Sequence, residues 1–106
     1  MTTPGAAATQ RWRDKNRELL NAQRRADRLA RRAEVARLKE ASPCTDCGGH
    51  FPSVCMDFDH VGTDKIANVA RLIADGPMEK ILAEIAKCEL VCANCHRIRT
   101  ARRLSI

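Results

Sequence analysis

The sequence has very few aromatic side chains and no long apolar segment. Tyrosine is absent, and Trp12, Phe51 and Phe58 are the only aromatic residues in a chain of 106. Such a chain buries only a thin hydrophobic core, and small domains of this kind usually need a disulfide or a metal ion for stability. No apolar run reaches the roughly 18 residues of a membrane span, and the first residues lack the apolar stretch of a secretory signal. We therefore expect a cytoplasmic protein with no membrane contact.

Six cysteines are present despite this expected location. In the reducing cytosol cysteines bind metal more often than they form disulfides. Cys44 and Cys47 form one Cys-x-x-Cys pair, and Cys92 and Cys95 form a second. Each pair directs two thiolates at one ion from a single turn, so together they predict a structural Zn²⁺ site with four cysteine ligands. A redox-active pair is the main alternative, but neither pair has the strand-to-helix surroundings of a thioredoxin motif.

Charge is concentrated at the two ends of the chain. Residues 9–41 hold eleven Lys or Arg and five Asp or Glu, a net charge of +6, and residues 97–106 hold four arginines and no acid. Residues 42–96 carry a net charge of −4, from four basic and eight acidic side chains. Two basic arms around an acidic centre indicate a polyanionic partner, of which nucleic acid is the commonest. A solvated basic helix surface with no partner is the alternative.

The first 41 residues are expected to form an arm outside the metal-binding centre. Residues 1–8 are small and uncharged and predict a disordered leader. From Thr9, a plausible N-cap, to about Lys39 there is no Gly or Pro, which predicts one long basic helix. Ser42-Pro43 should end it. Its apolar stripe is weak, so the helix is expected to lie along DNA, to pair with a protein partner or a second copy, or to fray.

The centre and the C-terminus, residues 42–106, are expected to form the folded domain, giving an α+β, mostly helical protein. Apolar spacing predicts two helices, and Gly76 and Pro77 should separate them as a C-cap and a first-turn residue. The predicted elements are an extended segment over 53–58, helices over 64–75 and 78–87, a short strand at 90–91 and a helix over 97–103. The inward positions are predicted to be Ile66, Val69, Ala70 and Ile73 in the first helix and Ile81, Leu82 and Ile85 in the second. Cys55 and Cys88 should fill core positions.

Two of the three histidines stand beside residues of chemical interest. His60 follows Asp59, and His96 directly follows the last cysteine. A zinc ion with four protein ligands is closed to catalysis, so any chemistry must come from elsewhere. An Asp oxygen and a His nitrogen suit a divalent ion, and a second, uncoordinated histidine can deprotonate water. The alternative is that Asp59 caps a turn while both histidines are merely structural. His50 is expected to be a loop residue.

Three blocks of sequence resemble a known family. They are Cys44-x-x-Cys47-Gly48, Asp57-Phe58-Asp59-His60-Val61 and Cys88-Glu89-Leu90-Val91-Cys92-Ala93-Asn94-Cys95-His96-Arg97-x-Arg99-Thr100. Together they resemble the HNH endonucleases, in particular the small members with a four-cysteine zinc site found in phages and bacteria. The resemblance covers roughly residues 44–100. It implies a ββα-metal (His-Me finger) motif, in which a two-stranded hairpin and a helix hold one divalent ion, inside a bacterial or phage-infected cell.

The resemblance also implies roles for individual residues. His60 would be the general base, Asp59 and His96 would bind a catalytic Mg²⁺, Mn²⁺ or Ni²⁺, and DNA would be cut. The asparagine in the middle of the family motif has no counterpart before the second cysteine pair, and Asn94 is the nearest candidate. Asp57 would be an extra metal-site carboxylate or a solvent-facing residue. A zinc-knuckle protein that binds DNA without cutting it is the alternative function, and an accessory protein whose long helix binds a partner is a third.

The arginines of both arms are the candidate DNA contacts. Phosphate contacts supply affinity and position but carry no sequence information. The candidates are Arg24, Arg25, Arg28, Arg31 and Arg32 in the N-terminal arm and Arg97, Arg99, Arg102 and Arg103 beside His96.

Overall fold

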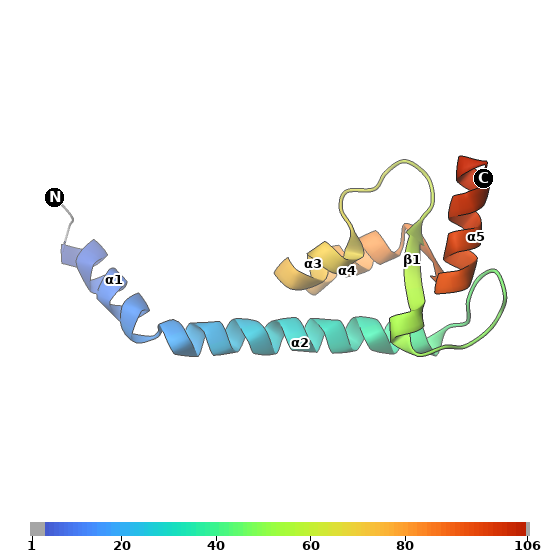
Figure 1. Cartoon of the computed structure of the whole chain (residues 1–106). Coiled ribbons are helices and arrows are strands. Elements are labelled where there is room, and N and C mark those ends of the chain that lie inside the picture. The colour runs from blue at the N-terminus through green and yellow to red at the C-terminus, as the bar shows by residue number, and fades with distance from the viewer. Residues whose placement is uncertain (1–3, 106) are drawn as a thin grey trace.

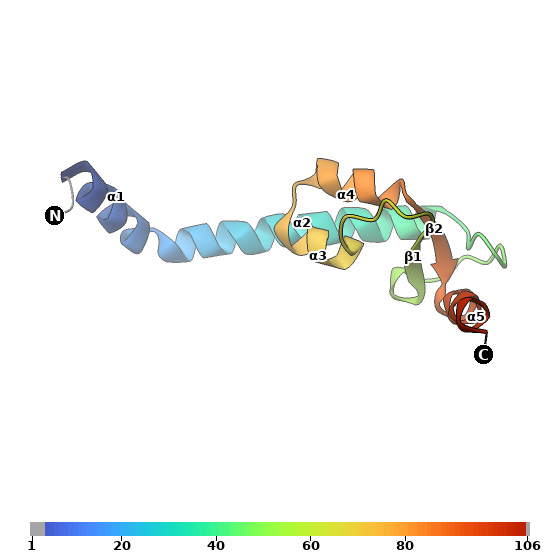
Figure 2. The ribbon, with the colours of Figure 1, turned by 90° about the horizontal axis from the view of Figure 1, so that it is seen from above.

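The computed structural model describes residues 4–105 and is an α+β, mostly helical fold. Helices α1 (Pro4–Lys15) and α2 (Arg17–Ala41) form an N-terminal arm, and the remaining elements pack at the C-terminal end of α2 (Figure 1). The molecule is elongated, 62 × 26 × 22 Å, because the first half of α2 extends beyond the rest of the fold (Figure 2). None of the described helices has the length and apolar character needed to cross a membrane.

The arm differs from the single helix expected from Thr9. Residues 4–8, predicted to belong to a disordered leader, are helical in α1, because proline is favoured in a first turn and alanine has the highest helix propensity. The leader's residues 1–3 lie outside the described residues. Thr9 is not a cap, since its hydroxyl donates to the Gly5 carbonyl inside α1.

A second difference is the break at Asn16, which leaves helical geometry (φ −105°, ψ 10°) and separates α1 from α2. Its side-chain amide and its own backbone N–H both donate to the Trp12 carbonyl, at 2.7 and 3.0 Å. Asparagine side chains compete with the backbone for such carbonyls and so disfavour helix interiors. The end of α2 agrees with the prediction, because Ser42, before Pro43, is extended.

Two antiparallel strands and a following helix form the centre of the fold. The short 3₁₀ turn η1 (Ser53–Cys55) precedes β1 (Met56–His60), which pairs with β2 (Cys88–Cys92). Asp57 lies opposite Val91, and Asp59 lies opposite Glu89. Helix α5 (Ala93–Leu104) begins directly after β2. Strand β2 and helix α5 are therefore longer than predicted, and the first residues of the expected extended segment form the 3₁₀ turn.

In the sequence, helices α3 (Val69–Asp75) and α4 (Met78–Ile85) come between the two strands, and both helices are shorter than expected. Helix α3 begins at Val69 rather than at residue 64, and Ile66, predicted to face the core, is 81% exposed. Leu82 was also wrongly placed inward, since its side chain is 45% exposed. Gly76 ends α3 as predicted, with positive φ (63°) and its N–H on the Leu72 carbonyl.

The hydrophobic core consists of two small clusters. The first surrounds the cysteines and contains Cys44, Met56, Val91 and Cys92. The second joins the arm to the helices through Val35, Val69 and Ile81, with Phe58 and Cys88 packed against it. Both remaining cysteines are partly buried: Cys88 packs against the second cluster, as expected, whereas Cys55 belongs to neither cluster.

Candidate metal centre and the adjoining cleft

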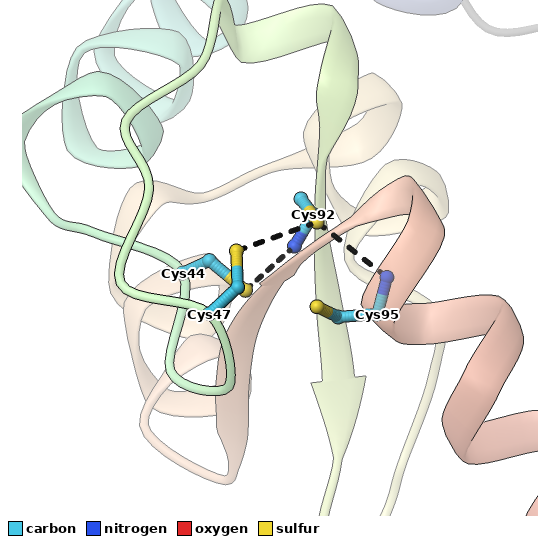
Figure 3. A group of neighbouring side chains, drawn as sticks. All are labelled: Cys44, Cys47, Cys92 and Cys95. Carbon is cyan, nitrogen blue, oxygen red and sulfur yellow. Dashed lines mark hydrogen bonds between the residues drawn. The ribbon is translucent and has the colours of Figure 1, made fainter.

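The four cysteines of the two Cys-x-x-Cys pairs come together in one place. Cys44 and Cys47 lie in a tight turn, and Cys92 and Cys95 lie where β2 passes into α5 (Figure 3). The turn is closed by the N–H of Gly48 on the Cys44 carbonyl, and Gly48 has the positive φ (73°) that glycine adopts readily. The N–H of Thr45 donates to the Leu90 carbonyl and fastens the turn to β2.

The sulfur atoms of this group are close enough to hold one metal ion. All four lie within 4.8 Å of one another, and the Cys47 and Cys92 sulfurs are 4.0 Å apart. Metal–sulfur bonds of about 2.3 Å in a tetrahedron put the sulfurs about 3.8 Å apart. Within residues 4–105 this is the only group of three or more His, Cys, Asp or Glu side chains that meets this distance criterion. The spacing is consistent with a structural zinc site.

Backbone N–H groups point at the sulfur atoms. The N–H of Cys92 donates to the Cys44 sulfur (3.2 Å), and the N–H of Cys95 donates to the Cys92 sulfur (3.5 Å). Burial of Cys44 opposes its ionisation, but the N–H groups of Cys47 and Cys92 outweigh this and lower its pKa to about 6. These donors favour the thiolate, which is the form that binds metal. Within the group, by contrast, the hydrogen bond with Cys92 raises the pKa of Cys95 to about 12, and outside it burial raises the pKa of Cys88.

A histidine and two carboxylates meet beside this centre. The ring of His96, in the first turn of α5, faces Asp57 and Asp59, which share one face of β1 because strand residues alternate in direction. His96 Nδ1 is 3.0 Å from Asp57 Oδ2, and His96 Nε2 is 3.7 Å from Asp59 Oδ1. The first distance is a hydrogen bond, with the ring donating to the carboxylate, and the second is not. Asp57 thus holds the ring so that Nε2 points toward Asp59.

Asp59 is buried, with 5% of its surface exposed, and is neutralised by two arginines. Arg103 forms a two-point contact with its oxygens (2.9 and 2.6 Å), and Arg99 donates to Oδ2 (2.9 Å). The Arg103 hydrogen bond, supported by Arg99, lowers the pKa of Asp59 to about 2 despite burial. The carboxylate is therefore ionised at neutral pH.

Arg99 also links the cysteine turn to α5. Its guanidinium donates twice to Asp46, between the first two cysteines, at 2.6 Å each, and once to Glu89 at 3.2 Å. Two of the arginines predicted to contact DNA, Arg99 and Arg103, are thus engaged with carboxylates of the protein itself. Arg97 and Arg102 are exposed on α5 and make no salt bridge with a described residue.

His60 is paired with a glutamate that sequence reasoning missed. His60 Nε2 lies 2.9 Å from Glu84 Oε1, and the Glu84 carboxylate, 2% exposed, also accepts from Lys87 and from the N–H of Ile66. The Ile66 N–H is the largest cause that lowers the pKa of Glu84 to about 2. Because Glu84 is ionised, the shared hydrogen sits on His60 Nε2. The sequence signal that could have identified Glu84 is its position. It lies three residues after Ile81 and therefore on the apolar face of α4, where a charged residue needs a partner.

Asn94 and His50, two other residues considered from sequence, make no contact of this kind with the described residues of the cleft. Asn94 is exposed in the first turn of α5, and within the described chain its side chain makes no hydrogen bond to His60. His50 is exposed in the loop before η1, as expected of a loop residue.

The residues of interest line one open cleft of about 540 Å³. It is bounded by β1, by the start of α5, by α3 and its preceding loop, and by the last turns of α2. Its walls contain Asp57, Asp59, His60, His96, Lys39, Lys65, Asn68 and Arg103, with Phe58, Val69, Ala70 and Ile73. Carboxylates, imidazoles and cations of three elements thus share one solvent-accessible space.

Comparisons with family models, with curated proteins and with solved structures found no match to this chain.

Proposed function

We propose that this protein is a metal-dependent HNH endonuclease that hydrolyses DNA phosphodiester bonds. The observation that carries the proposal is the convergence of Asp59, His60 and His96 on one cleft, with Asp59 Oδ1 and His96 Nε2 3.7 Å apart. These residues come from β1 and from the helix after β2, in the strand–strand–helix order of a ββα-metal motif. A module that only binds DNA has no need of this trio.

The four cysteines are proposed to hold structural Zn²⁺. Thiolate ligands at tetrahedral spacing suit zinc, and four protein ligands leave no position for substrate. The site joins the Cys44 turn to the β2–α5 junction, elements that share only a thin core. Its role is to set the direction of α5, and with it the position of His96, directly after the last ligand.

The residues that would hold a catalytic ion fit that task. Two ligand atoms bonded to one ion at about 2.1 Å can be at most about 4.2 Å apart, and the Asp59 and His96 atoms are 3.7 Å apart. Asp57 fixes the His96 ring through Nδ1, the carboxylate–histidine arrangement common behind metal ligands. When bound there, Mg²⁺, Mn²⁺ or Ni²⁺ would polarise the scissile phosphate and neutralise charge on the leaving oxygen.

His60 is proposed to take the proton from the attacking water. Glu84 accepts the hydrogen on Nε2, which leaves Nδ1 as the proton acceptor. The carboxylate also balances the positive charge that the ring gains with the proton. Glu84 would thus do what the missing middle asparagine does in the family, which is to orient the base.

Arg103 is proposed to change partners during the reaction. It occupies both oxygens of Asp59, so an ion bound at Asp59 would compete with this guanidinium for the carboxylate. Once released, Arg103 remains in the cleft wall, where a phosphate can accept its N–H groups.

The same contact favours a second candidate, a DNA-binding protein without catalysis. Asp59 is already satisfied by Arg103 and Arg99, and Asn94 does not reach His60. In that case the arginines would close the site permanently, and DNA would bind without being cut.

Plasmid nicking separates the two candidates. We expect zinc-loaded protein to nick supercoiled DNA with Mg²⁺, Mn²⁺ or Ni²⁺, and His60→Ala to lose at least about 100-fold in rate, the scale of general-base catalysis. His50→Ala, which changes an exposed loop histidine, should match the wild type. DNA binding without nicking under all three ions would establish the binding-only function. Equal nicking by wild type and His60→Ala would show that His60 is not the base.

A further inference from the structure

Most of the arginines of α2 lie on one face of the helix. With 3.6 residues per turn, six of them fall within about 120° of the circumference. They are Arg17, Arg24, Arg25, Arg28, Arg31 and Arg32. At the centre of the same arc is Val35, which is 2% exposed and packs against Val69 and Ile81. The acidic residues of α2 all fall outside the arc. The arginine face therefore points to the side on which the rest of the protein lies.

This face leads into the cleft. Lys39, on the same arc, lines the cleft together with Asp57, His60 and His96. About two turns earlier, Arg32 shares a smaller groove of about 210 Å³ with Lys39 and Ile73. The cleft and the smaller groove thus meet at Lys39, and α2 continues from them beyond the rest of the fold (Figure 1).

Some arginines of α2 already bind other groups of the protein. Arg31 donates to the carbonyls of Ile73 and Ala74 at the end of α3 (2.8 and 2.9 Å) and so anchors the arm. On the opposite face Arg37 pairs with Glu34. By contrast, Arg24, Arg25, Arg28 and Arg32 have no salt bridge or side-chain hydrogen bond within residues 4–105.

We infer that duplex DNA held in the cleft continues along α2, with its phosphates on Arg32, Arg28 and Arg25. Lys39 and Arg24 are fifteen residues apart, about 22 Å of helix, which matches about six or seven base pairs of one strand's phosphates. The bound duplex is therefore longer on the arm side of the cut than on the other. This inference rests on the proposed function and adds the path of the substrate.

Charge decides between DNA and a second copy as the occupant of this face. Pairing two arms through it would put arginine against arginine, which is repulsive. The exposed leucines Leu19 and Leu29 lie outside the arc and about 80° apart, so they form no continuous apolar seam on it. A phosphate backbone supplies the opposite charge along the whole length.

The test compares a triple variant, Arg25→Gln, Arg28→Gln and Arg32→Gln, with the control Arg37→Gln. Binding of the zinc-loaded proteins to labelled duplexes is measured without a catalytic ion, at several salt concentrations. Each phosphate contact contributes about 0.9 to the slope of log K against log salt, so the triple variant should lose about 2.7 from that slope. Its affinity at low salt should fall at least about tenfold, while the control stays within about twofold.

Duplex length supplies a second readout. Wild-type affinity should keep rising until the duplex fills both the cleft and the arm, and the triple variant should reach its plateau about six base pairs earlier. An unchanged slope and plateau in the triple variant would overturn the inference and leave the nuclease proposal intact. Wild-type protein that binds no duplex at all would overturn both. A triple variant that differs from wild type in sedimentation but not in DNA binding would identify the face as a self-association surface and also overturn it.

Discussion

His96 Nε2 lies 3.7 Å from Asp59 Oδ1, although 36 residues of sequence separate the two side chains. The antiparallel pairing of β1 and β2 puts Asp59 opposite Glu89, and α5 then turns back so that His96 faces β1. The turn into α5 is where Cys92 and Cys95 lie. The cysteine centre and the cleft therefore share one structural element, the start of α5, which carries both Cys95 and His96.

Removing the metal should unfold the region built on the cysteine centre. Thiolates held together without an ion repel one another, and apart from Cys44 and Cys92 the surrounding core has only two buried residues, Met56 and Val91. We expect a strong chelator to remove about one zinc per chain and to reduce the helical circular dichroism signal cooperatively. Cys92→Ser should behave like the chelated protein, whereas Cys55→Ser, outside the centre, should keep its zinc. Chelated protein with an unchanged spectrum would contradict this role.

Asp57→Asn should weaken binding of the proposed catalytic ion without affecting binding of zinc. The amide accepts a weaker hydrogen bond from His96 Nδ1, so the ring is oriented less firmly, and loss of such a partner typically costs about 10–100-fold in metal affinity. The measurement is Mn²⁺ binding followed by electron paramagnetic resonance, together with zinc content. Asp75→Asn, at the exposed end of α3, is the control. Unchanged Mn²⁺ affinity in Asp57→Asn would show that Asp57 does not support the ligand.

Glu84→Gln should change the tautomer of His60 as well as the nicking rate. An ionised Glu84 keeps the hydrogen on Nε2, whereas an amide can donate to or accept from the ring. In ¹⁵N spectra, neutral His60 should be the Nε2–H tautomer in wild type and a mixture in the variant. The rate constant for nicking should fall at least about tenfold with little change in DNA affinity. Glu79→Gln, exposed on the same helix, is the control, and an unchanged tautomer would exclude the orienting role.

Glu84 should also stabilise the fold in a pH-dependent way. The Ile66 N–H, with Lys87 and His60, holds the pKa of Glu84 at about 2, below its ordinary value of 4.5. Stability from such a depressed pKa is present above the unfolded value and is lost as pH falls toward the folded value. The free energy of unfolding of wild type should therefore exceed that of Glu84→Gln by the largest amount above about pH 5. This difference should become smaller as the pH falls from about 5 to about 2. Urea denaturation of both proteins measures this difference at the pH values at which both still hold zinc. A gap that is constant with pH would contradict the assignment.

Two isoleucines of similar sequence context should respond very differently to truncation. Ile81 is completely buried and Ile66 is 81% exposed, although periodicity placed both on a core face. Ile81→Ala should lower the free energy of unfolding by about 2–5 kcal/mol, and Ile66→Ala should change it by no more than about 0.5 kcal/mol. Urea denaturation of the zinc-loaded proteins checks both. Equal effects would mean that the loop before α3 packs differently.

Local chemistry in the sequence determined several features. Cys-x-x-Cys spacing predicts which thiols come together, because each pair spans a single turn, and the four sulfurs do lie within 4.8 Å of one another. Ser42-Pro43 ends α2 and Gly76 ends α3 for reasons within one or two residues. The α+β, mostly helical class followed from the same local signals.

Tertiary structure alone decided the rest, because it depends on partners distant in sequence. The chain before Val69 is not helical, and there the Glu84 carboxylate, from α4, accepts the N–H groups of Ile66 and Ala67. The Asp59 carboxylate is held by Arg99 and Arg103, 40 and 44 residues away. Neither contact has a signature in local spacing, because the packing of α4 against the loop before α3 creates the first and the direction of α5 along β1 creates the second. The four clustered cysteines could thus be identified from sequence, whereas the partners of His60, His96 and Asp59 required the fold.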